Sequence, residues 1–405
     1  MINKEKLLEI SKKYGTPLYI YDGDLIKEQY SKLKKNLIYS KTKIFYAMKA
    51  NYNPSILKLL KEEGASIDAV SPGDVLLALE VGFEKENILF TANRITEEEM
   101  HLVKSKGVLF NIGSIYDLES FGKNYPNSEV CIRFNPMVVA GENDQVITGG
   151  ENSKFGIFID EKEKVLEICE EYGLKIVGVH EHTGSGIPEA VQMMEGVKNI
   201  LDFLNKEDFP DLRFVDFGGG FKVPYKPEEK EMDLEKFGKE TSHLFEEFCK
   251  KFGKELEMYF EPGKFLVSES GHLLVKVVDI KRTPKKLLAG VNSGFPQLIR
   301  PMFYRAYHEI DNLSNTNNEK KKYDIVGNIC ESGDCFAWDR ELPEIREGDL
   351  LDIRNAGAYC YAMGGQYNLR PMPPEVLVLE GKVELIRKGL TTEEMIEKII
   401  EESKT

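Results

Sequence analysis

The sequence predicts an α/β protein with two parts, a (β/α)8 barrel followed by a β-rich domain of sandwich or barrel type. Strand-like segments alternate with helix-like segments over residues 43–263, and after residue 263 strand-like segments follow one another without helices. Alternation of strand and helix indicates a parallel sheet, and eight such units match a barrel of roughly 250 residues. Because a chain of 405 residues exceeds the length at which one core stops growing, two domains are expected.

The barrel strands are expected where short runs are rich in apolar and β-branched residues. They lie at 43–50, 66–71, 87–92, 108–113, 129–135, 175–182, 213–220 and 257–263. Helices are expected at 54–64, 72–82, 96–107, 160–173 and 233–253, each ending on glycine as a helix C-cap does. We expect the barrel at 22–267 and the β-rich domain at 1–21 and 268–405.

The β-rich domain is predicted from strand-like runs that no helix separates, at 271–282, 285–292, 323–330, 348–355 and 375–387. Residues 16–21 are also strand-like, so the amino terminus is expected to add a strand to this domain. The charged stretch 312–322 is expected to form a surface loop. Thr391 and Glu394 form a capping-box pattern that begins a final amphipathic helix at 392–402.

Composition argues against several classes of partner. The net charge is −14, from 54 basic and 68 acidic residues, which disfavours nucleic acid and anionic membrane surfaces. No apolar run approaches the ~20 residues that span a bilayer, and the first residues lack the pattern of a secretory signal. We therefore expect a cytoplasmic protein. Its six cysteines form no CxxC pair, which predicts free thiols that are mostly buried.

Lys49 is the first candidate for chemistry, because it ends the first predicted strand in the segment YAMKAN at 46–51. The carboxyl ends of barrel strands carry the active site. In an apolar setting the amine is partly deprotonated, so Lys49 could form a Schiff base with an aldehyde. The alternative interpretation is a lysine that simply reaches solvent from a strand end.

His180 and His182 end the sixth predicted strand, and alternation directs both side chains to the same side of the sheet. One interpretation is a metal site, but the other histidines (101, 243, 272 and 308) lie on no barrel strand end, so we expect no metal. In the second interpretation, an imidazole stacks on a planar cofactor while the turn TGSG at 183–186 binds an anion. A histidine that fills core space is the third.

Two further segments lie at expected strand ends. The segment DFGGG at 216–220 has glycines that let backbone amides approach a phosphate closely, although a glycine triplet is also common in flexible turns. The segment EPGK at 261–264 brings a carboxylate, a tight turn and a cation to the same mouth. Phosphate sites after strands 7 and 8 recur in barrels. An ordinary ion pair is the alternative role of Glu261.

The β-rich domain has candidates of its own. The segment NICESGD at 328–334 places Cys330 among acidic residues and glycine, which indicates a loop, although a lone cysteine is more often buried and structural. The segment AGAY follows at 356–359. Arg300 and Tyr304 together could bind a carboxylate, whereas an arginine beside proline is more often at the surface.

Taken together, these segments resemble the alanine-racemase-like, barrel-type pyridoxal phosphate decarboxylases, and among them most closely the diaminopimelate decarboxylases. The resemblance runs from about Gly15 to about Val378. The motifs that support it, in chain order, are YAMKAN at 46–51, GENSKFG at 150–156, HTGSG at 182–186, GGG at 218–220, EPG at 261–263, CESGD at 330–334 and YN at 367–368.

This resemblance implies a cofactor and the residues that hold it. Lys49 would carry pyridoxal 5'-phosphate covalently, His182 would stack on the ring, and Glu261 would keep the ring nitrogen protonated, so that the ring accepts electrons. Ser185, Gly219, the turn at 261–264 and Tyr359 would hold the phosphate. The cofactor-binding set that we assign is Lys49, Asp68, His182, Ser185, Gly218, Gly219, Gly220, Glu261, Pro262, Gly263, Lys264 and Tyr359.

The resemblance also implies the reaction, decarboxylation of meso-2,6-diaminopimelate to L-lysine and CO2, the last step of lysine biosynthesis. The enzyme would be a homodimer with shared active sites, in which Cys330 from the partner subunit reprotonates the carbanion and Glu331 binds the distal ammonium. Arg300, Tyr304 and Lys264 would bind the distal carboxylate. The expected catalytic residues are Lys49, Cys330 and His182, and the expected substrate-binding residues are Lys264, Arg300, Tyr304, Glu331 and Tyr359.

The chain departs from the family pattern at three places. Lys264 follows Glu-Pro-Gly where relatives have arginine, which binds a carboxylate through two parallel hydrogen bonds that lysine does not offer. Asn292 replaces a usual aspartate, and GGQ at 364–366 replaces Ser-Ser-Asn. The alternatives are therefore decarboxylation of ornithine, arginine, D-lysine or carboxynorspermidine on the same fold, an amino-acid racemase, a non-catalytic pyridoxal phosphate carrier, and a metal-dependent barrel hydrolase.

Overall fold

The computed structural model describes residues 2–142, 145, 147–187, 189–317 and 319–404. It divides into two compact units. The barrel unit comprises residues 29–223 and 231–266, and the β-rich unit comprises residues 1–28, 224–230 and 267–405. The prediction of a barrel together with a separate β-rich domain is therefore confirmed.

The barrel unit contains a closed parallel sheet. Over the described residues its strands are β2 (Thr42–Ala47), β3 (Ser66–Ala69), β4 (Ile88–Phe90), β5 (Leu109–Ile112), β6 (Glu129–Asn135), β8 (Lys175–His180), β9 (Phe214–Asp216) and β10 (Glu257–Phe260). The order β5-β4-β3-β2-β10-β9-β8-β6 closes through the pairing of β5 with β6, and the short strand β7 (Ile157–Phe158) adds to β6. All eight predicted barrel strands are present, but most end a few residues earlier than expected.

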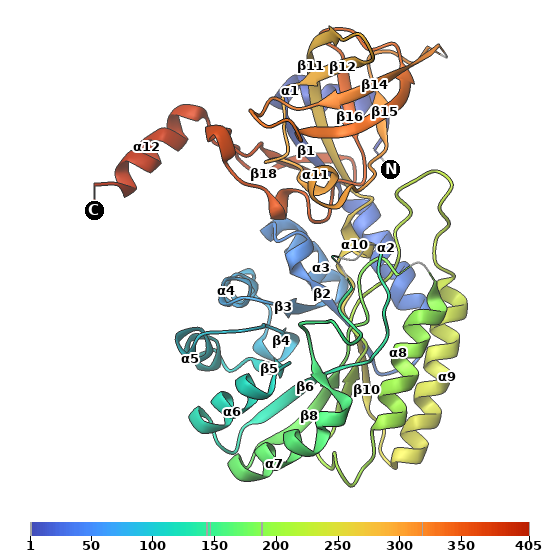
Figure 1. The fold of residues 1–405 in the computed structure, drawn as a ribbon, viewed down its shortest axis with the longest axis vertical. Coiled ribbons are helices and arrows are strands. Elements are labelled where there is room, and N and C mark those ends of the chain that lie inside the picture. Colours follow the sequence, from blue (N-terminus) through green and yellow to red (C-terminus); the bar gives the residue numbers. More distant parts are fainter. Residues whose placement is uncertain (1, 143–144, 146, 188, 318, 405) are drawn as a thin grey trace. The chain divides into compact units, whose positions relative to one another are not determined.

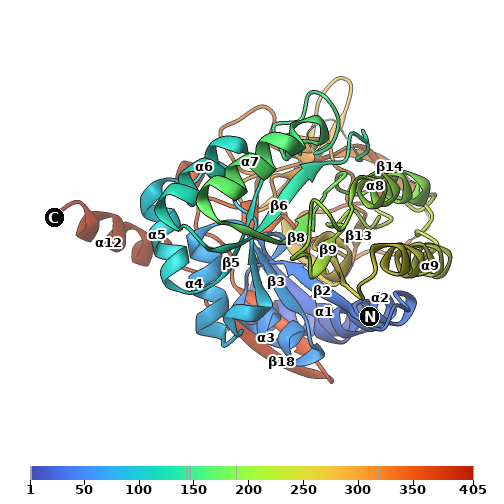
Figure 2. The same cartoon turned by 90° about the horizontal axis from the view of Figure 1, so that it is seen from below.

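Helices surround this barrel, as Figure 2 shows. They are α2 (Gly23–Asn36), α3 (Pro54–Glu63), α4 (Pro72–Val81), α5 (Glu97–Ser105), α6 (Ile115–Asn124), α7 (Lys162–Tyr172), α8 (Ala190–Phe203) and α9 (Leu234–Phe252). Left-handed glycines end α3, α4, α7 and α9, as predicted. The expected cap at Gly107 is wrong, because α5 ends at Ser105 with Lys106 as its C-cap. The sequence prediction omitted α2, α6 and α8. Helix α6 is interrupted by glycine, which weakens the helical signal.

A buried cluster that draws on six barrel strands forms part of the core. Its members are Phe45, Leu89, Cys131, Val177, Phe214 and Tyr259. The rings of Phe214 and Tyr259 are stacked, with centroids 4.4 Å apart. Layers of large side chains from alternating strands are how barrels of this size fill their interior. The wall strands are thereby held at fixed positions, which in turn fixes the loops at their carboxyl ends.

The β-rich unit is built on one mixed sheet (Figure 1). Its strands are β1 (Leu18–Asp22), β11 (Gly271–Arg282), β12 (Leu287–Val291), β13 (Ile310–Asn312), β14 (Lys320–Val326), β15 (Cys335–Pro343), β16 (Leu350–Ile353), β17 (Glu375–Leu379) and β18 (Lys382–Arg387). Strand β1 lies between β11 and β17, which confirms that the amino terminus adds a strand to this unit. Its helices are α1 (Lys4–Tyr14), α11 (Arg300–Tyr304) and α12 (Thr392–Glu402).

Three expectations for the β-rich unit need correction. The single run at 375–387 is a hairpin, because Glu380 and Gly381 both have positive φ, as a tight two-residue turn requires. The expected loop at 312–322 already contains the start of β14. Strand β15 was not predicted, because the run of charged residues at its centre, Asp339 to Glu341, conceals the apolar alternation. The capping box at Thr391 is confirmed.

Among the described residues, none of the helices combines the length and the apolar character needed to cross a bilayer.

Gly238 on α9 gives a test of barrel packing, because a Cβ there would lie 2.0 Å from the backbone oxygen of Asn36. Helix propensity alone predicts that Gly238→Ala stabilises the protein by about 1 kcal/mol. We instead expect a loss of about 1–3 kcal/mol, since the added methyl must displace backbone. Urea unfolding of the variant measures the difference. The exposed neighbouring variant Lys239→Ala should stay within about 0.5 kcal/mol of the parent, and a more stable Gly238→Ala would contradict the packing.

Candidate active site

Lys49 lies at the carboxyl end of a barrel strand, in the 3₁₀ turn Met48–Ala50 that follows β2. Its side chain is 41% exposed, and its Nζ donates to Oδ2 of the fully buried Asp68 on β3 at 2.5 Å. Burial raises the pKa of Asp68, Glu261 raises it further, and Lys49 opposes both. The amine is therefore accessible at the barrel mouth but anchored by a buried carboxyl group.

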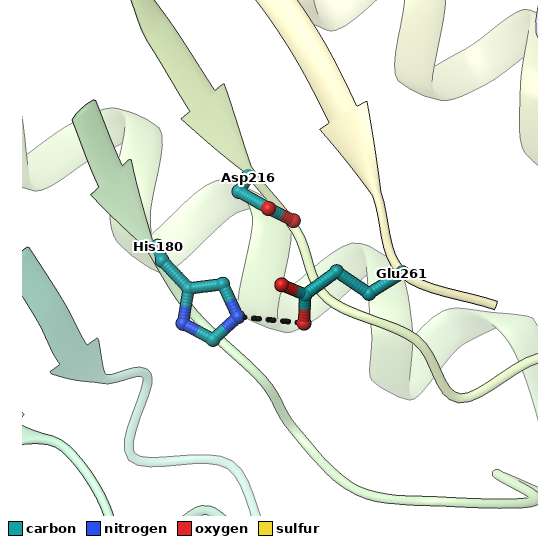
Figure 3. A group of neighbouring side chains, drawn as sticks. All are labelled: His180, Asp216 and Glu261. Atoms are coloured by element: carbon teal, nitrogen blue, oxygen red, sulfur yellow. Dashed lines mark hydrogen bonds and ion pairs between the residues drawn. The ribbon is translucent and has the colours of Figure 1, made fainter. Parts of the chain in front are cut away.

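A buried cluster of three residues lies at the ends of β8, β9 and β10. His180 Nε2 lies 3.0 Å from Glu261 Oε2, and Figure 3 shows the Asp216 carboxyl group facing Glu261 from the neighbouring strand. One atom from each of the three residues lies within 4.8 Å of the other two. Burial is the main cause that raises the pKa of Glu261 and of Asp216, and that lowers the pKa of His180.

This cluster corrects the sequence argument about metal. That argument counted only histidines, and it found too few near His180. The structure adds two carboxyl groups, so His180, Asp216 and Glu261 offer three atoms of the kind that a divalent ion binds. Among the described residues this is the one such group of three or more.

His182 lies just beyond β8 and against the glycine-rich segment. The Gly219 amide donates to His182 Nδ1 at 3.1 Å, so Nδ1 is an acceptor and carries no proton. Burial lowers the pKa of His182 well below its usual value, and Arg133 lowers it further. The ring is thus a neutral imidazole whose position is set by backbone, as a group that stacks on a planar ligand needs.

The glycines at 218–220 permit a close approach that other residues would not. Gly218 and Gly220 have φ of +62° and +113°, and a Cβ on Gly219 would lie 2.5 Å from the Glu261 backbone oxygen. Asp216 Oδ1 accepts from the Gly218 amide at 2.9 Å. The segment therefore packs directly against the EPG turn, which leaves backbone rather than side chains at this edge.

Lys264 is buried and follows the EPG turn, at the start of α10 (Lys264–Val267). Its Nζ forms a short ion pair with Glu142, which lies in the segment between β6 and β7. Ser185 contacts the same segment, because the amide of Glu142 donates to the Ser185 carbonyl at 3.0 Å. The lysine that replaces the family's arginine is thus engaged by a carboxylate of its own chain.

The remaining predicted residues belong to the β-rich unit. Arg300 is buried, lies 4.6 Å over the ring of Tyr225, and is 3.1 Å from His308 Nε2, so the alternative interpretation, a surface arginine, is wrong. Tyr304 is half-buried on α11, and Tyr359 has a positive φ of 56°. Asn292 donates to Thr16 at 2.9 Å, which gives this departure from the family pattern a structural role.

Cys330 and Glu331 are exposed in the loop between β14 and β15, as the sequence predicted for this segment. The backbone amide of Cys330 donates to Asn368 Oδ1 at 2.8 Å. All six cysteines are free, and only Cys330 among them is exposed. It is therefore the thiol that a second molecule can reach.

The structure thus brings together the predicted residues of the barrel unit, Lys49, Asp68, His182, Gly218, Gly219 and Glu261, at the carboxyl ends of neighbouring strands. Sequence reasoning missed Arg133 on β6, which is buried at the same end and lies 5.0 Å over Phe155. The signal was available, because Arg133 is the single charge in the apolar run 130–134. It also missed Glu181, whose pKa is raised to about 8 by burial, although Thr183 donates to it at 3.0 Å.

Comparison with known proteins gives consistent matches. Residues 23–268 match the family model described as pyridoxal-dependent decarboxylase, pyridoxal binding domain. A diaminopimelate decarboxylase of Methanothermobacter thermautotrophicus is 40% identical over 98% of this chain and 94% of that protein. One from Aquifex aeolicus is 37% identical over 94% and 91%. A crystal structure of diaminopimelate decarboxylase from Helicobacter pylori complexed with L-lysine has a TM-score of 0.88 at 30% identity, covering 98% of this chain and 99% of that one.

Glu181 gives a test by pH. The folded carboxyl group stays protonated up to about pH 8, whereas in the unfolded chain it ionises near pH ~4.3. Between these values the unfolded state binds fewer protons, so stability falls as pH rises, by up to about 1.4 kcal/mol per pH unit. Glu181→Gln should remove this slope.

The measurement is urea unfolding of both proteins at several pH values inside that window. The exposed variant Glu170→Gln serves as the control and should keep the parent's slope. A gap between parent and Glu181→Gln that stays constant with pH would contradict the assignment.

Proposed function

The chain belongs to the pyridoxal-dependent decarboxylases, and on that premise we propose that it converts meso-2,6-diaminopimelate to L-lysine and CO2 with pyridoxal 5'-phosphate as cofactor. The observation that carries the proposal is the match to diaminopimelate decarboxylases over nearly the whole chain, at up to 40% identity. The reaction is that of a carboxy-lyase at the last step of lysine biosynthesis. We propose that the enzyme is cytoplasmic.

The residues present fit the cofactor in three respects. Lys49 offers a primary amine at the barrel mouth for the aldehyde. Glu261 presents a buried carboxyl group at the carboxyl end of β10, which suits the ring nitrogen. The glycine segment at 218–220 presents backbone where added side chains would clash, as a phosphate cradle requires. When bound, pyridoxal phosphate supplies an electron-poor ring that takes up the electron pair left by departing CO2.

The chain's own residues would then control charge and orientation. Glu261 would hold a proton on the ring nitrogen, because its carboxylate lies in a low-dielectric site where a unit charge acts strongly. Neutral His182 would stack on the ring without adding charge. We assign phosphate binding to Ser185, Gly219, Gly220, the turn at 261–264 and Tyr359, and a supporting role to Asp68, which anchors Lys49.

We propose that the protein is a homodimer with shared active sites, in which the partner subunit supplies Cys330 and Glu331. Loss of CO2 breaks the bond between Cα and the carboxyl carbon, and the Cα then needs a proton. The thiol of Cys330 would donate that proton and recover one from solvent, while the carboxylate of Glu331 would bind the distal ammonium group. The exposure of both residues supports this role, since a buried thiol could not reach a second chain.

We assign recognition of the distal carboxylate to Lys264, Arg300 and Tyr304. The ion pair of Lys264 with Glu142 adds a condition, because the substrate carboxylate must compete with Glu142 for the same ammonium group. A lysine offers a point charge rather than an arginine fork, so Arg300 would provide the planar, two-bond contact. Preference for ornithine, arginine, D-lysine or carboxynorspermidine is the alternative outcome.

The metal-dependent hydrolase is the second candidate, and one observation favours it: the cluster of His180, Asp216 and Glu261. Against it stands the match of residues 23–268 to the family model described as pyridoxal-dependent decarboxylase, pyridoxal binding domain. Metal analysis of the purified protein, together with its visible absorbance, distinguishes the two candidates.

Substrate selection tests the proposed reaction. Protein loaded with pyridoxal phosphate should release CO2 from meso-diaminopimelate at least about tenfold faster than from ornithine, arginine, either lysine enantiomer or carboxynorspermidine, because only diaminopimelate offers a distal carboxylate together with a distal ammonium group. Lys49→Ala should lose the reaction and the cofactor's visible band together. Preference for another amino acid would contradict the proposal.

Cys330→Ala tests the proton donor. We expect product formation to slow by about 10²-fold or more while cofactor binding is retained, since general acid catalysis commonly contributes 10²–10⁴-fold. The buried variant Cys169→Ala is the control and should keep the parent's rate.

Mixing then tests whether sites are shared. If they are, Lys49→Ala and Cys330→Ala subunits combined should recover activity, because each mixed dimer contains one site with both native residues. No recovery after verified subunit exchange would contradict a shared site.

A further inference from the structure

Two buried side chains on neighbouring strands, His180 and Asp216, surround the carboxyl group of Glu261. Its Oε2 is held by His180 Nε2 at 3.0 Å, and its carboxyl group also forms a side-chain hydrogen bond with Asp216. His180 and Asp216 are both fully buried, at 0% exposure, and Glu261 is 7% exposed. A buried carboxyl group is costly unless neighbouring groups hydrogen-bond to it, and contacts from two neighbouring strands fix the orientation of Glu261.

His180 acts on Glu261 as a hydrogen-bond donor. Burial, reinforced by Arg133, lowers the pKa of His180 well below its usual value, so the ring is neutral. A neutral imidazole carries one N–H, and a contact of 3.0 Å with a carboxylate places that proton on Nε2. His180 Nδ1 has no partner, which agrees with this tautomer. The donated hydrogen bond orients the Glu261 carboxyl plane and favours its ionised form.

Asp216 faces Glu261 from β9 (Figure 3). Its Oδ1 accepts from the Gly218 amide at 2.9 Å, and its carboxyl group also forms a side-chain hydrogen bond with Glu261. Two ionised carboxylates so close together in a buried site would repel each other. Burial first, and then Glu261, raise the pKa of Asp216 well above its usual value, so Asp216 remains neutral. The pair therefore presents one negative charge rather than two.

Other charged and titratable groups face this pair from every neighbouring strand. Burial raises the pKa of Glu261, and the cationic groups of Lys49 after β2 and Arg133 on β6 oppose this rise and favour its ionised form. Asp68 on β3 and Glu181 after β8 are acidic, and burial raises the pKa of both. His182 is neutral and adds no charge. Within the facing pair of Asp216 and Glu261, the single negative charge is therefore placed on Glu261.

We propose that His180 and Asp216 are positioning residues that hold Glu261 as an oriented, singly charged partner for the cofactor's ring nitrogen. His180 supplies the hydrogen bond that fixes Glu261 Oε2. Asp216 supplies a neutral carboxyl group that holds the glycine segment and Glu261 in fixed relative positions. This inference rests on the proposed function, since it takes pyridoxal phosphate as the ligand. In this role the cluster of His180, Asp216 and Glu261 binds the cofactor ring rather than a metal ion.

Paired substitutions test the two roles. His180→Gln keeps an N–H donor at the end of its side chain, whereas His180→Leu removes the donor and keeps the bulk. Asp216→Asn keeps a neutral group of the same shape, whereas Asp216→Ala removes it. His272→Leu is the matched control, because His272 forms a similar buried contact, 2.8 Å from Asp352, in the β-rich unit.

The readouts are the dissociation constant of pyridoxal phosphate and the pH dependence of its visible absorbance when bound, both measured without amino acid. We expect His180→Leu and Asp216→Ala to weaken cofactor binding by about ten- to hundredfold, the size of a hydrogen bond to a charged group. The pH at which the visible band changes should move in both. His180→Gln, Asp216→Asn and the control His272→Leu should remain within about threefold of the parent and keep its pH profile. Circular dichroism confirms that each variant is folded.

Three results would overturn the inference. The first is a parent-like spectrum and affinity in His180→Leu. The second is an Asp216→Asn variant as impaired as Asp216→Ala, which would mean that Asp216 acts as an anion. The third is a stoichiometric divalent metal in the parent that Asp216→Asn loses. If the parent protein binds pyridoxal phosphate but leaves diaminopimelate intact, only the proposed reaction is contradicted. If it binds no pyridoxal phosphate, the proposed reaction and this inference are both contradicted.

Discussion

Burial of charge at the carboxyl ends of the barrel strands is the constraint on which the site depends. Asp68, Asp216 and Glu261 are all buried, and three carboxylates ionised together in that space would not be stable. Lys49 pairs with Asp68, and the pKa of Asp216 is raised well above its usual value by burial and by Glu261. The arrangement leaves Glu261 as the carboxylate that His180 and Asp216 hold by hydrogen bonds.

The barrel provides this constraint through its geometry. Parallel strands bring all their carboxyl ends to one edge, so residues separated by more than two hundred positions, such as Lys49 and Glu261, come to share one electrostatic environment. The short strands β9 and β10 end just before the glycine segment and the EPG turn, and the absence of side chains at 218–220 lets these two loops touch. Backbone contact there also sets the tautomer of His182, through the Gly219 amide.

Lys264 illustrates how a departure from a family pattern is accommodated by the rest of the chain. The lysine keeps a cation after the EPG turn, and Glu142 from a distant loop pairs with it. A compact ammonium group and an arginine fork differ in how they bind carboxylates. If Lys264 binds the distal carboxylate as we propose, its pair with Glu142 would link substrate recognition to the loop between β6 and β7. Asn292, by contrast, binds Thr16 and so supports the entry of β1 into its sheet.

The sequence by itself determined the architecture and most of the site. Periodicity and glycine caps predicted all eight barrel strands, and the motifs at strand ends marked Lys49, His182 and Glu261, because local patterns specify local backbone. It did not reveal β15, where charges mask the alternation, nor the roles of Arg133, Asp216 and Glu181. Those roles follow from burial and from the distance between charges on different strands. Only the tertiary structure decides these quantities, because the pKa of a carboxyl group depends on neighbours that the fold, rather than the adjacent sequence, brings to it.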